Sequence, residues 1–272
     1  MNILPVISNF KDQMEVIYKD FHQHPEIGFE EVRTSQIVAQ YLNDFGVDEV
    51  HTEIGVTGVV GVIRGKHAGN RRVGLRADMD ALPIHEETDL PFKSQTDGKM
   101  HACGHDAHTT MLLGAAKHLA ETRNFQGEVI VIFQPAEEGL GGAKAMIEDG
   151  LFDRFPCDEV YGMHNSPSGK PGTFEICRGA AMAGAAFFDI HVTGKGAHAA
   201  MPQNSKDAIQ ITNSLITDLN AIISRNVPPL DTCVLSITQV HAGSAYNVIP
   251  QTAHLCGTIR YFKDDIFNLV CD

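Results

Sequence analysis

Short apolar runs alternate with longer amphipathic segments between residues 58 and 163, and this alternation restricts the fold more than any other feature of the chain. Short apolar runs bounded by turn residues indicate strands, whereas apolar residues spaced three and four positions apart indicate helices. Strands that alternate with helices form an α/β sheet with helices on its faces, and ligands bind outside the carboxyl ends of its strands. We predict strands at 58–64, 73–77, 128–133 and 159–163, and helices at 107–120 and 143–149.

The flanking segments predict the remaining parts of the fold. Before this region, two apolar stripes at helical spacing run from Ile7 to Phe21 and from Ile37 to Phe45, and proline or glycine follows each. After residue 180 the order of elements changes to strand, helix, strand, strand, which indicates a smaller second domain. These elements are predicted at 187–192, 207–224, 232–240 and 253–261, with a further helix from 264. We therefore predict a first domain at 1–180 and a second at 181–272.

Side chains that bind metals follow the predicted strands. Cys103 and His105 lie in the segment HACGHD at 101–106, Glu137 and Glu138 follow the strand at 128–133, and His164 follows the strand at 159–163. A thiolate, imidazoles and a carboxylate suit zinc, and manganese suits a site in which oxygen ligands dominate. In an adjacent glutamate pair, one carboxylate can bind the metal while its neighbour takes a proton from the metal-bound water. The pattern predicts a metallohydrolase site.

Composition and charge narrow the classes of partner. Hydrophobic residues make up 43% of the 272 residues and charged residues 20%, as in ordinary globular proteins. The net charge of -13 disfavours nucleic acid and anionic membranes as partners, so we expect a small-molecule substrate. The six cysteines form no CxxC pair, and no apolar run reaches the ~20 residues of a membrane-spanning helix. Because residues 1–5 also lack the features of a signal peptide, we expect a cytoplasmic protein.

Six segments give the chain a resemblance to a known family. They are HQHPEIG at 22–28, RADMDALP at 76–83, HACGHD at 101–106, QPAEE at 134–138, KGAHAAMP at 195–202 and NVIP at 247–250. The chain resembles the M20 metallopeptidases, in particular the amidohydrolases of hippurate, indole-acetyl-amino acids and other N-acyl amino acids. The resemblance implies a zinc-exopeptidase-like α/β catalytic domain followed by an α+β, ferredoxin-like lid that usually dimerises.

The family's catalytic domain resumes after the lid, and this chain contains no matching segment. The resemblance therefore implies that both domains are incomplete at the C-terminus and that a further histidine ligand is missing. From this we expect the 272-residue form to have an incomplete metal centre, little amidase activity, and poor solubility or dependence on a partner chain.

The resemblance also assigns roles to individual residues of the first domain. It implies a centre of two divalent ions, Mn²⁺ or Zn²⁺, bound by Cys103, His105, Glu138 and His164. Glu137 is then the general base. Asp78 and Asp80 have a weaker claim, to orienting a ligand imidazole, and a plain turn at the end of a strand explains either of them nearly as well.

In the second domain, the resemblance implies that His198 binds the substrate carbonyl and stabilises the oxyanion, often across a homodimer formed by the lid. An ordinary loop histidine is the alternative. Asn247 and Arg260 are predicted to bind the substrate carboxylate, although an arginine in such a strand is commonly a solvated charge. His85, His101, His108 and His241 receive no role beyond support of the ligands.

We conclude from the sequence that the chain is a metal-dependent amidohydrolase that cleaves the amide bond of N-acyl amino acids of the hippurate type, by attack of a metal-bound water with Glu137 as base. Two alternatives remain open. The chain is a truncated, non-catalytic remnant that binds metal or dimerises, or it is a hydrolase in which Cys103 is a nucleophile assisted by His105. Inhibition by a chelator, reversed by manganese or zinc, separates the second alternative from the metal mechanism.

Overall fold

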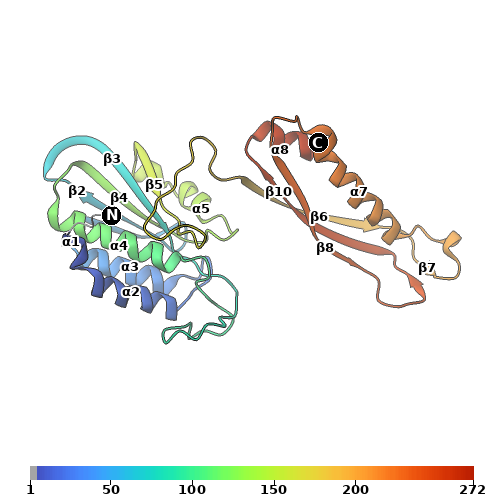
Figure 1. Ribbon diagram of the computed structural model, residues 1–272, viewed down its shortest axis with the longest axis horizontal. Coiled ribbons are helices and arrows are strands. Elements are labelled where there is room, and N and C mark those ends of the chain that lie inside the picture. The colour runs from blue at the N-terminus through green and yellow to red at the C-terminus, as the bar shows by residue number, and fades with distance from the viewer. Residues whose placement is uncertain (1–4) are drawn as a thin grey trace. The chain divides into compact units, whose positions relative to one another are not determined.

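The computed structural model describes residues 5–272, which divide into two compact units (Figure 1). The first reaches to Gly172 and the second runs from Thr173 to Asp272, whereas the boundary predicted from the sequence lies between 180 and 181. Within the described residues, no helix combines the length and apolar character needed to cross a bilayer. Residues 1–4, on which much of the signal-peptide argument rests, lie outside the described part of the chain.

The first unit is built around a mixed five-stranded sheet. Its strands lie in the order β1 (Glu49–Ile54), β2 (Gly58–Arg64), β4 (Gln126–Gln134), β3 (His67–Asp78) and β5 (Glu159–Gly162). Strand β3 pairs in parallel with both β4 and β5, whereas β1 with β2 and β2 with β4 are antiparallel. The carboxyl ends of the neighbouring strands β4, β3 and β5 therefore meet at one edge of the sheet.

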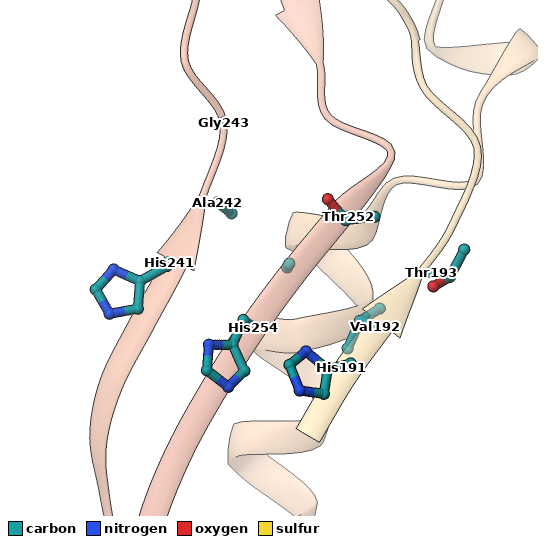
Figure 2. A pocket seen from close by; sticks show the side chains of 9 residues that line it. His191, Val192, Thr193, His241, Ala242, Gly243, Thr252 and His254 are labelled. Atoms are coloured by element: carbon teal, nitrogen blue, oxygen red, sulfur yellow. The ribbon is translucent and has the colours of Figure 1, made fainter. Parts of the chain in front are cut away.

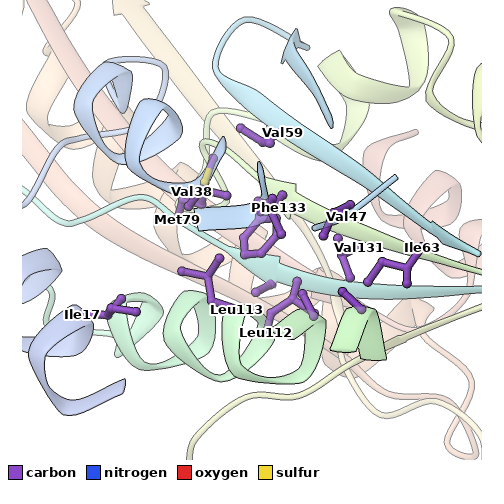
Figure 3. Packing of buried hydrophobic residues seen from close by; sticks show 14 of the residues in the cluster. Ile17, Val38, Val47, Val59, Ile63, Met79, Leu112, Leu113, Val131 and Phe133 are labelled. Atoms are coloured by element: carbon purple, nitrogen blue, oxygen red, sulfur yellow. The ribbon is translucent and has the colours of Figure 1, made fainter. Parts of the chain in front are cut away.

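Both faces of the central strands are buried, which explains why they read as continuous apolar runs. In β4, Val131 and Phe133 belong to one core, whereas Ile130 and Ile132 belong to the core on the opposite face. This follows from the period of two residues in a strand. The first core also contains residues of α2 (Lys11–Gln23), α3 (Val32–Asp44) and α4 (His105–Thr122), as Figure 3 shows in part; the second contains residues of α5 (Gly142–Glu148) and α6 (Leu151–Arg154).

Two predictions for the first unit need correction. The single helix expected over the first apolar stripe is two helices, α1 (Pro5–Ser8) and α2, because the Phe10 N–H bonds to the Ile7 carbonyl and closes the first in a tight turn. The apolar spacing continues through this break and therefore does not reveal it. Strand β1 was not predicted, because most of its side chains are polar and only partly buried.

The second unit contains a three-stranded antiparallel sheet in the order β6 (Gly184–Thr193), β10 (Thr252–Tyr261) and β8 (Cys233–Ala242). Helices α7 (Ala208–Asn226) and α8 (Asp264–Cys271) contribute to a core with Leu235 and Ile259 on one face of this sheet. Asp207 caps α7 by accepting from the backbone N–H groups of residues 209 and 210. The short strands β7 (Ala197–His198) and β9 (Val248–Ile249) form a separate ribbon, and η1 (Pro202–Asn204) follows β7. This is the α+β arrangement predicted for the lid.

Candidate metal centre

The predicted metal ligands lie at the edge where three parallel strands end. Asp78 is the last residue of β3, and Asp80 comes two residues later. The glutamate pair comes shortly after the end of β4, and His164 comes just after β5. Cys103 and His105 lie at the start of α4, whose N-cap Gly104 has a φ of 91°. A residue with a side chain would be strained at this φ, and its Cβ atom would approach the end of the Asn165 side chain to 2.7 Å, so both features favour glycine here.

Potential ligand atoms of the site form overlapping groups around His105. Ligand atoms of Cys103, His105 and His164 lie within 4.8 Å of one another, and so do ligand atoms of His105, Glu137 and Glu138. Cys103 Sγ is 3.3 Å from His164 Nε2, and His105 Nε2 is 3.8 Å from Glu138 Oε1. The structure thus brings together all five residues predicted to bind metal or to act as the base.

His105 Nε2 supplies the test of whether a cation fits. It is buried and has no hydrogen-bond partner among the described residues. The carboxylate oxygens nearest to it, Asp78 Oδ2 at 3.7 Å and Glu138 Oε1 at 3.8 Å, are too far away for a hydrogen bond. Two ligands of one divalent ion, each about 2.0–2.2 Å from it, have a comparable separation. An unpaired imidazole nitrogen that faces carboxylates and a thiol therefore fits a borderline divalent cation such as zinc.

Asp80 contacts two of the predicted ligands. His105 Nδ1 lies 2.9 Å from the backbone oxygen of Asp80 and 3.1 Å from its Oδ1, so in the neutral ring Nδ1 carries the proton and Nε2 presents its lone pair. The other carboxylate oxygen, Oδ2, accepts from the backbone N–H of Glu138 at 2.9 Å. Burial tends to raise the pKa of Asp80, but the contacts with His105 and with backbone N–H groups lower it, so the side chain is ionised.

The turn after β4 points both glutamates to the same side through a strained residue. Ala136 has a φ of 49°, in the left-handed region that alanine rarely adopts. Its N–H donates to Glu31 Oε1 at 2.8 Å, and Glu31 is fully buried and also accepts from Thr57 Oγ1 at 2.7 Å. Because the turn breaks the strict alternation of a strand, the side chains of Glu137 and Glu138 both reach His105.

His108 is part of a buried network that the sequence did not predict. Its Nδ1 lies 2.7 Å from Asp78 Oδ1, and its Nε2 contacts both the side-chain oxygen and the backbone N–H of Asn165. Arg76 donates to the other oxygen of Asp78 at 2.7 Å. Burial opposes ionisation of Asp78, but the His108 contact and the Arg76 charge outweigh it and lower its pKa to about 2. The sequence did contain one signal for this network: His105 and His108 are three residues apart and therefore lie on one face of α4.

The acid–base properties of Cys103 and Glu137 differ from those of ordinary side chains. Burial, reinforced by Glu138, raises the pKa of the Cys103 thiol to about 12, so the thiol stays protonated unless a cation lies beside it. Cys103 Sγ also contacts His164 and not His105. Both observations argue against a cysteine nucleophile paired with His105.

Burial and the charge of Glu138 raise the pKa of Glu137, which moves this carboxylate toward the range of an effective base at neutral pH.

Two further histidines lie buried in the first unit. His22 lies between Asp106, at 2.6 Å from its Nδ1, and Glu86, at 3.2 Å from its Nε2. His101 has no hydrogen-bond partner on either ring nitrogen among the described residues, and burial lowers its pKa to about 4. Neither histidine belongs to the groups around His105.

The residues predicted to bind substrate lie in the second unit. His198 pairs with Val248 across the β7–β9 ribbon, and the Asn247 carbonyl accepts from the Ala199 N–H, so His198 and Asn247 are close. Arg260 lies toward the opposite end of β10, eight positions from Thr252 and therefore roughly 27 Å along an extended strand. Its guanidinium contacts Thr258 and lies over the Phe187 ring. The structure does not bring Arg260 to Asn247 within one chain.

Comparison with known proteins identifies the family. A model described as peptidase family M20/M25/M40 matches residues 74–256. Hippurate hydrolase of Campylobacter jejuni is 50% identical, and the match covers 99% of this chain and 70% of that protein. The IAA-amino acid hydrolase ILR1-like 4 of Arabidopsis thaliana is 43% identical, over 96% of this chain and 58% of that protein. The crystal structure of Bacillus subtilis YXEP, described as a dinuclear metal-binding peptidase of the M20 family, matches with a TM-score of 0.78 and 36% identity over 97% of this chain and 67% of that one. The chain therefore belongs to peptidase family M20/M25/M40, a family of amide-bond hydrolases.

Proposed function

We propose that this chain is a metal-dependent amidohydrolase that cleaves N-acyl amino acids of the hippurate type into a carboxylic acid and an amino acid. The observation that carries the proposal is the edge at which β3, β4 and β5 end. There, an unpaired buried imidazole nitrogen of His105 faces Cys103, His164 and two adjacent glutamates. The 50% identity to a hippurate hydrolase supports the substrate class.

Cys103, His105, Glu138 and His164 would hold two divalent ions, of zinc or manganese. Such ions polarise the amide carbonyl and make water a better nucleophile at neutral pH. Asp80 keeps the His105 lone pair and the Glu138 backbone in place for binding. The low pKa of Asp78 keeps a negative charge beside the ligands, which favours a cation there.

Glu137 acts as the general base. It takes a proton from the attacking water and passes it to the nitrogen of the departing amine, which leaves as the free amino acid. The raised pKa of Glu137 suits both steps, because a carboxylate with an ordinary pKa would release the proton readily but accept it poorly. A neighbouring charged Glu138 is one cause of that shift.

His198 is proposed to donate a hydrogen bond to the oxyanion, and Asn247 and Arg260 to bind the substrate carboxylate. Within one chain the latter two lie near opposite ends of β10, so one carboxylate cannot contact both of them. If both bind the same substrate, one must come from a second copy of the chain. This separation favours the proposed homodimer, in which two second units contribute to each site.

The test compares Glu137→Gln with Glu138→Gln. Both substitutions keep the shape of the side chain, but an amide accepts no proton and binds cations weakly. Glu137→Gln should retain bound metal and lose hydrolysis of hippurate and N-acetyl amino acids, whereas Glu138→Gln should lose metal, measured by elemental analysis of the purified chain. Glu148→Gln, at an exposed glutamate of α5, is the control. Equal effects on metal content would remove the assignment of base and ligand, and loss of metal from Glu137→Gln alone would reverse it. The comparison requires a form of the enzyme with measurable hydrolase activity; a metal-loaded wild-type chain without it would favour the non-catalytic alternative.

A further inference from the structure

Three histidines lie side by side on the helix-free face of the sheet in the second unit. His254 of β10 is directly opposite His191 of β6 on one side and His241 of β8 on the other. Figure 2 shows the three imidazole rings in a row across these strands. The His191 and His254 rings stack with centroids 4.3 Å apart and planes 4° from parallel. The alternation of side chains along β10 places Ala253 in a core on the other face, with Leu255 also buried, and leaves His254 on this one.

The adjacent row of the same face adds a carboxylate and a thiol. Cys256 is directly opposite Asp189, two positions along each strand from the histidine pair. Asp189 Oδ1 lies 2.8 Å from His254 Nε2 and 3.1 Å from Cys256 Sγ, and Cys256 Sγ lies 3.2 Å from His254 Nε2. A nitrogen, a sulfur and an oxygen from two strands therefore converge on one point.

This arrangement is close to the one that a tetrahedral metal site requires. With bonds of about 2.0–2.3 Å, the ligand atoms of a tetrahedral zinc ion are roughly 3.3–3.6 Å apart. The three observed separations need to open by only a few tenths of an ångström, a change that small rotations of the exposed Asp189 and the half-buried His254 and Cys256 can make. The donor set of imidazole, thiolate and carboxylate matches zinc among the common cellular cations. His191, stacked on His254, is the nearest candidate for a fourth ligand.

We propose that Asp189, His254 and Cys256, with His191 beside them, form a second zinc site, on the sheet of the second unit. The ion would cross-link β6 and β10. Binding requires the neutral form of His254, and the Cys256 thiol gives up its proton to solvent as the Zn–S bond forms. The inference does not depend on the proposed amidohydrolase activity, because these residues belong to a different unit from the groups around His105.

Thiol labelling of the full wild-type chain tests the site without any substitution. Iodoacetamide modification of each cysteine is followed by peptide mass spectrometry, in chelator and in saturating zinc. Zinc should slow labelling of Cys256 at least tenfold and leave the exposed Cys177 unchanged. Labelling of Cys256 at the same rate in both conditions would overturn the proposal.

Cobalt substitution provides a second test, in a Cys103→Ser background so that the first centre contributes no thiolate. We expect this variant to show a thiolate-to-cobalt charge-transfer band that zinc displaces. Cys256→Ser should abolish the band, His254→Gln should weaken cobalt binding at least tenfold, and Cys177→Ser should change neither. Circular dichroism of the metal-free variants checks that they fold. Absence of the band, or its persistence after Cys256→Ser, would show that the residues form an ordinary polar surface cluster.

Discussion

Replacing Asp80 by asparagine should weaken metal binding at the first centre, although no proposed metal ligand is substituted. Asp80 Oδ1 contacts the protonated Nδ1 of His105, and Oδ2 accepts from the Glu138 N–H. An asparagine has one acceptor oxygen for these two donors. If its NH₂ group faces Glu138, two donors oppose each other; if it faces His105, it favours the tautomer whose Nε2 carries the proton and cannot bind metal.

The size of the effect follows from what remains after the substitution. The backbone oxygen of Asp80, 2.9 Å from His105 Nδ1, still holds the ring in place, so the loss should be limited. Loss of a group that orients a metal ligand commonly costs 10- to 100-fold in affinity, about 1.4–2.7 kcal/mol. We expect Asp80→Asn to lie near the lower end of this range and Asp80→Ala higher, because alanine leaves the partly buried Glu138 N–H without this acceptor.

The assay is competition for zinc with a chromophoric chelator. It is performed in the Cys256→Ser background, so that the proposed site on the second unit does not contribute. Asp97→Asn is the matched control, because Asp97 also contacts a histidine, His85, at 2.6 Å but is largely exposed. Zinc affinity of Asp80→Asn within twofold of the parent would refute the inference that Asp80 prepares His105 and Glu138 for the metal.

Two further predictions concern titration in the chelated protein. At pH 8, a pKa of about 12 gives Cys103 a thiolate fraction roughly a thousandfold below that of an ordinary thiol, and the greater nucleophilicity of its thiolate recovers only part of this difference. Iodoacetamide should therefore label Cys103 at least tenfold more slowly than Cys177, and equal rates would contradict the raised pKa. The contact with Asp106, supported by Glu86 and opposed by burial, raises the pKa of His22, so its charged form stabilises the fold below pH ~6.5 and this stability is lost as pH rises through the higher folded pKa. The deficit in unfolding free energy of His22→Asn, measured with urea, should thus be larger at pH 6 than at pH 9, and a deficit that grows with pH would show the opposite sign.

Much of the fold followed from local pattern. The strands β2, β3, β4 and β5 and the helix α4 were predicted because their apolar residues recur at a clear period. Strand directions were not predictable in this way. Both faces of β4 are buried, with Val131 in one core and Ile132 in the other. Such a strand has the same continuous apolar sequence whether its neighbours are parallel or antiparallel, so the mixed sheet appears only in the structure.

The site shows the same division between local and non-local information. The glutamate pair, His105 and Cys103 were predicted as site residues because neighbouring residues made a recognisable pattern. The partnership of His108 with Asn165, 57 residues apart, depends on how α4 packs against the loop after β5. The His191–His254 pair likewise depends on the register of β6 with β10, which no local pattern in either strand encodes.

Location of the metal by anomalous diffraction tests the central claim most directly. Crystals of the full chain loaded with zinc, measured on both sides of the zinc absorption edge, should show the two proposed ions as peaks at this centre, at least one of them within about 2.5 Å of Cys103 Sγ and of His105 Nε2. Glu138 and His164 should complete the ligands of that centre, with Glu137 close by but free to accept a proton. A zinc-loaded crystal with no peak between these residues, or with Glu137 as a ligand in place of Glu138, would contradict the account.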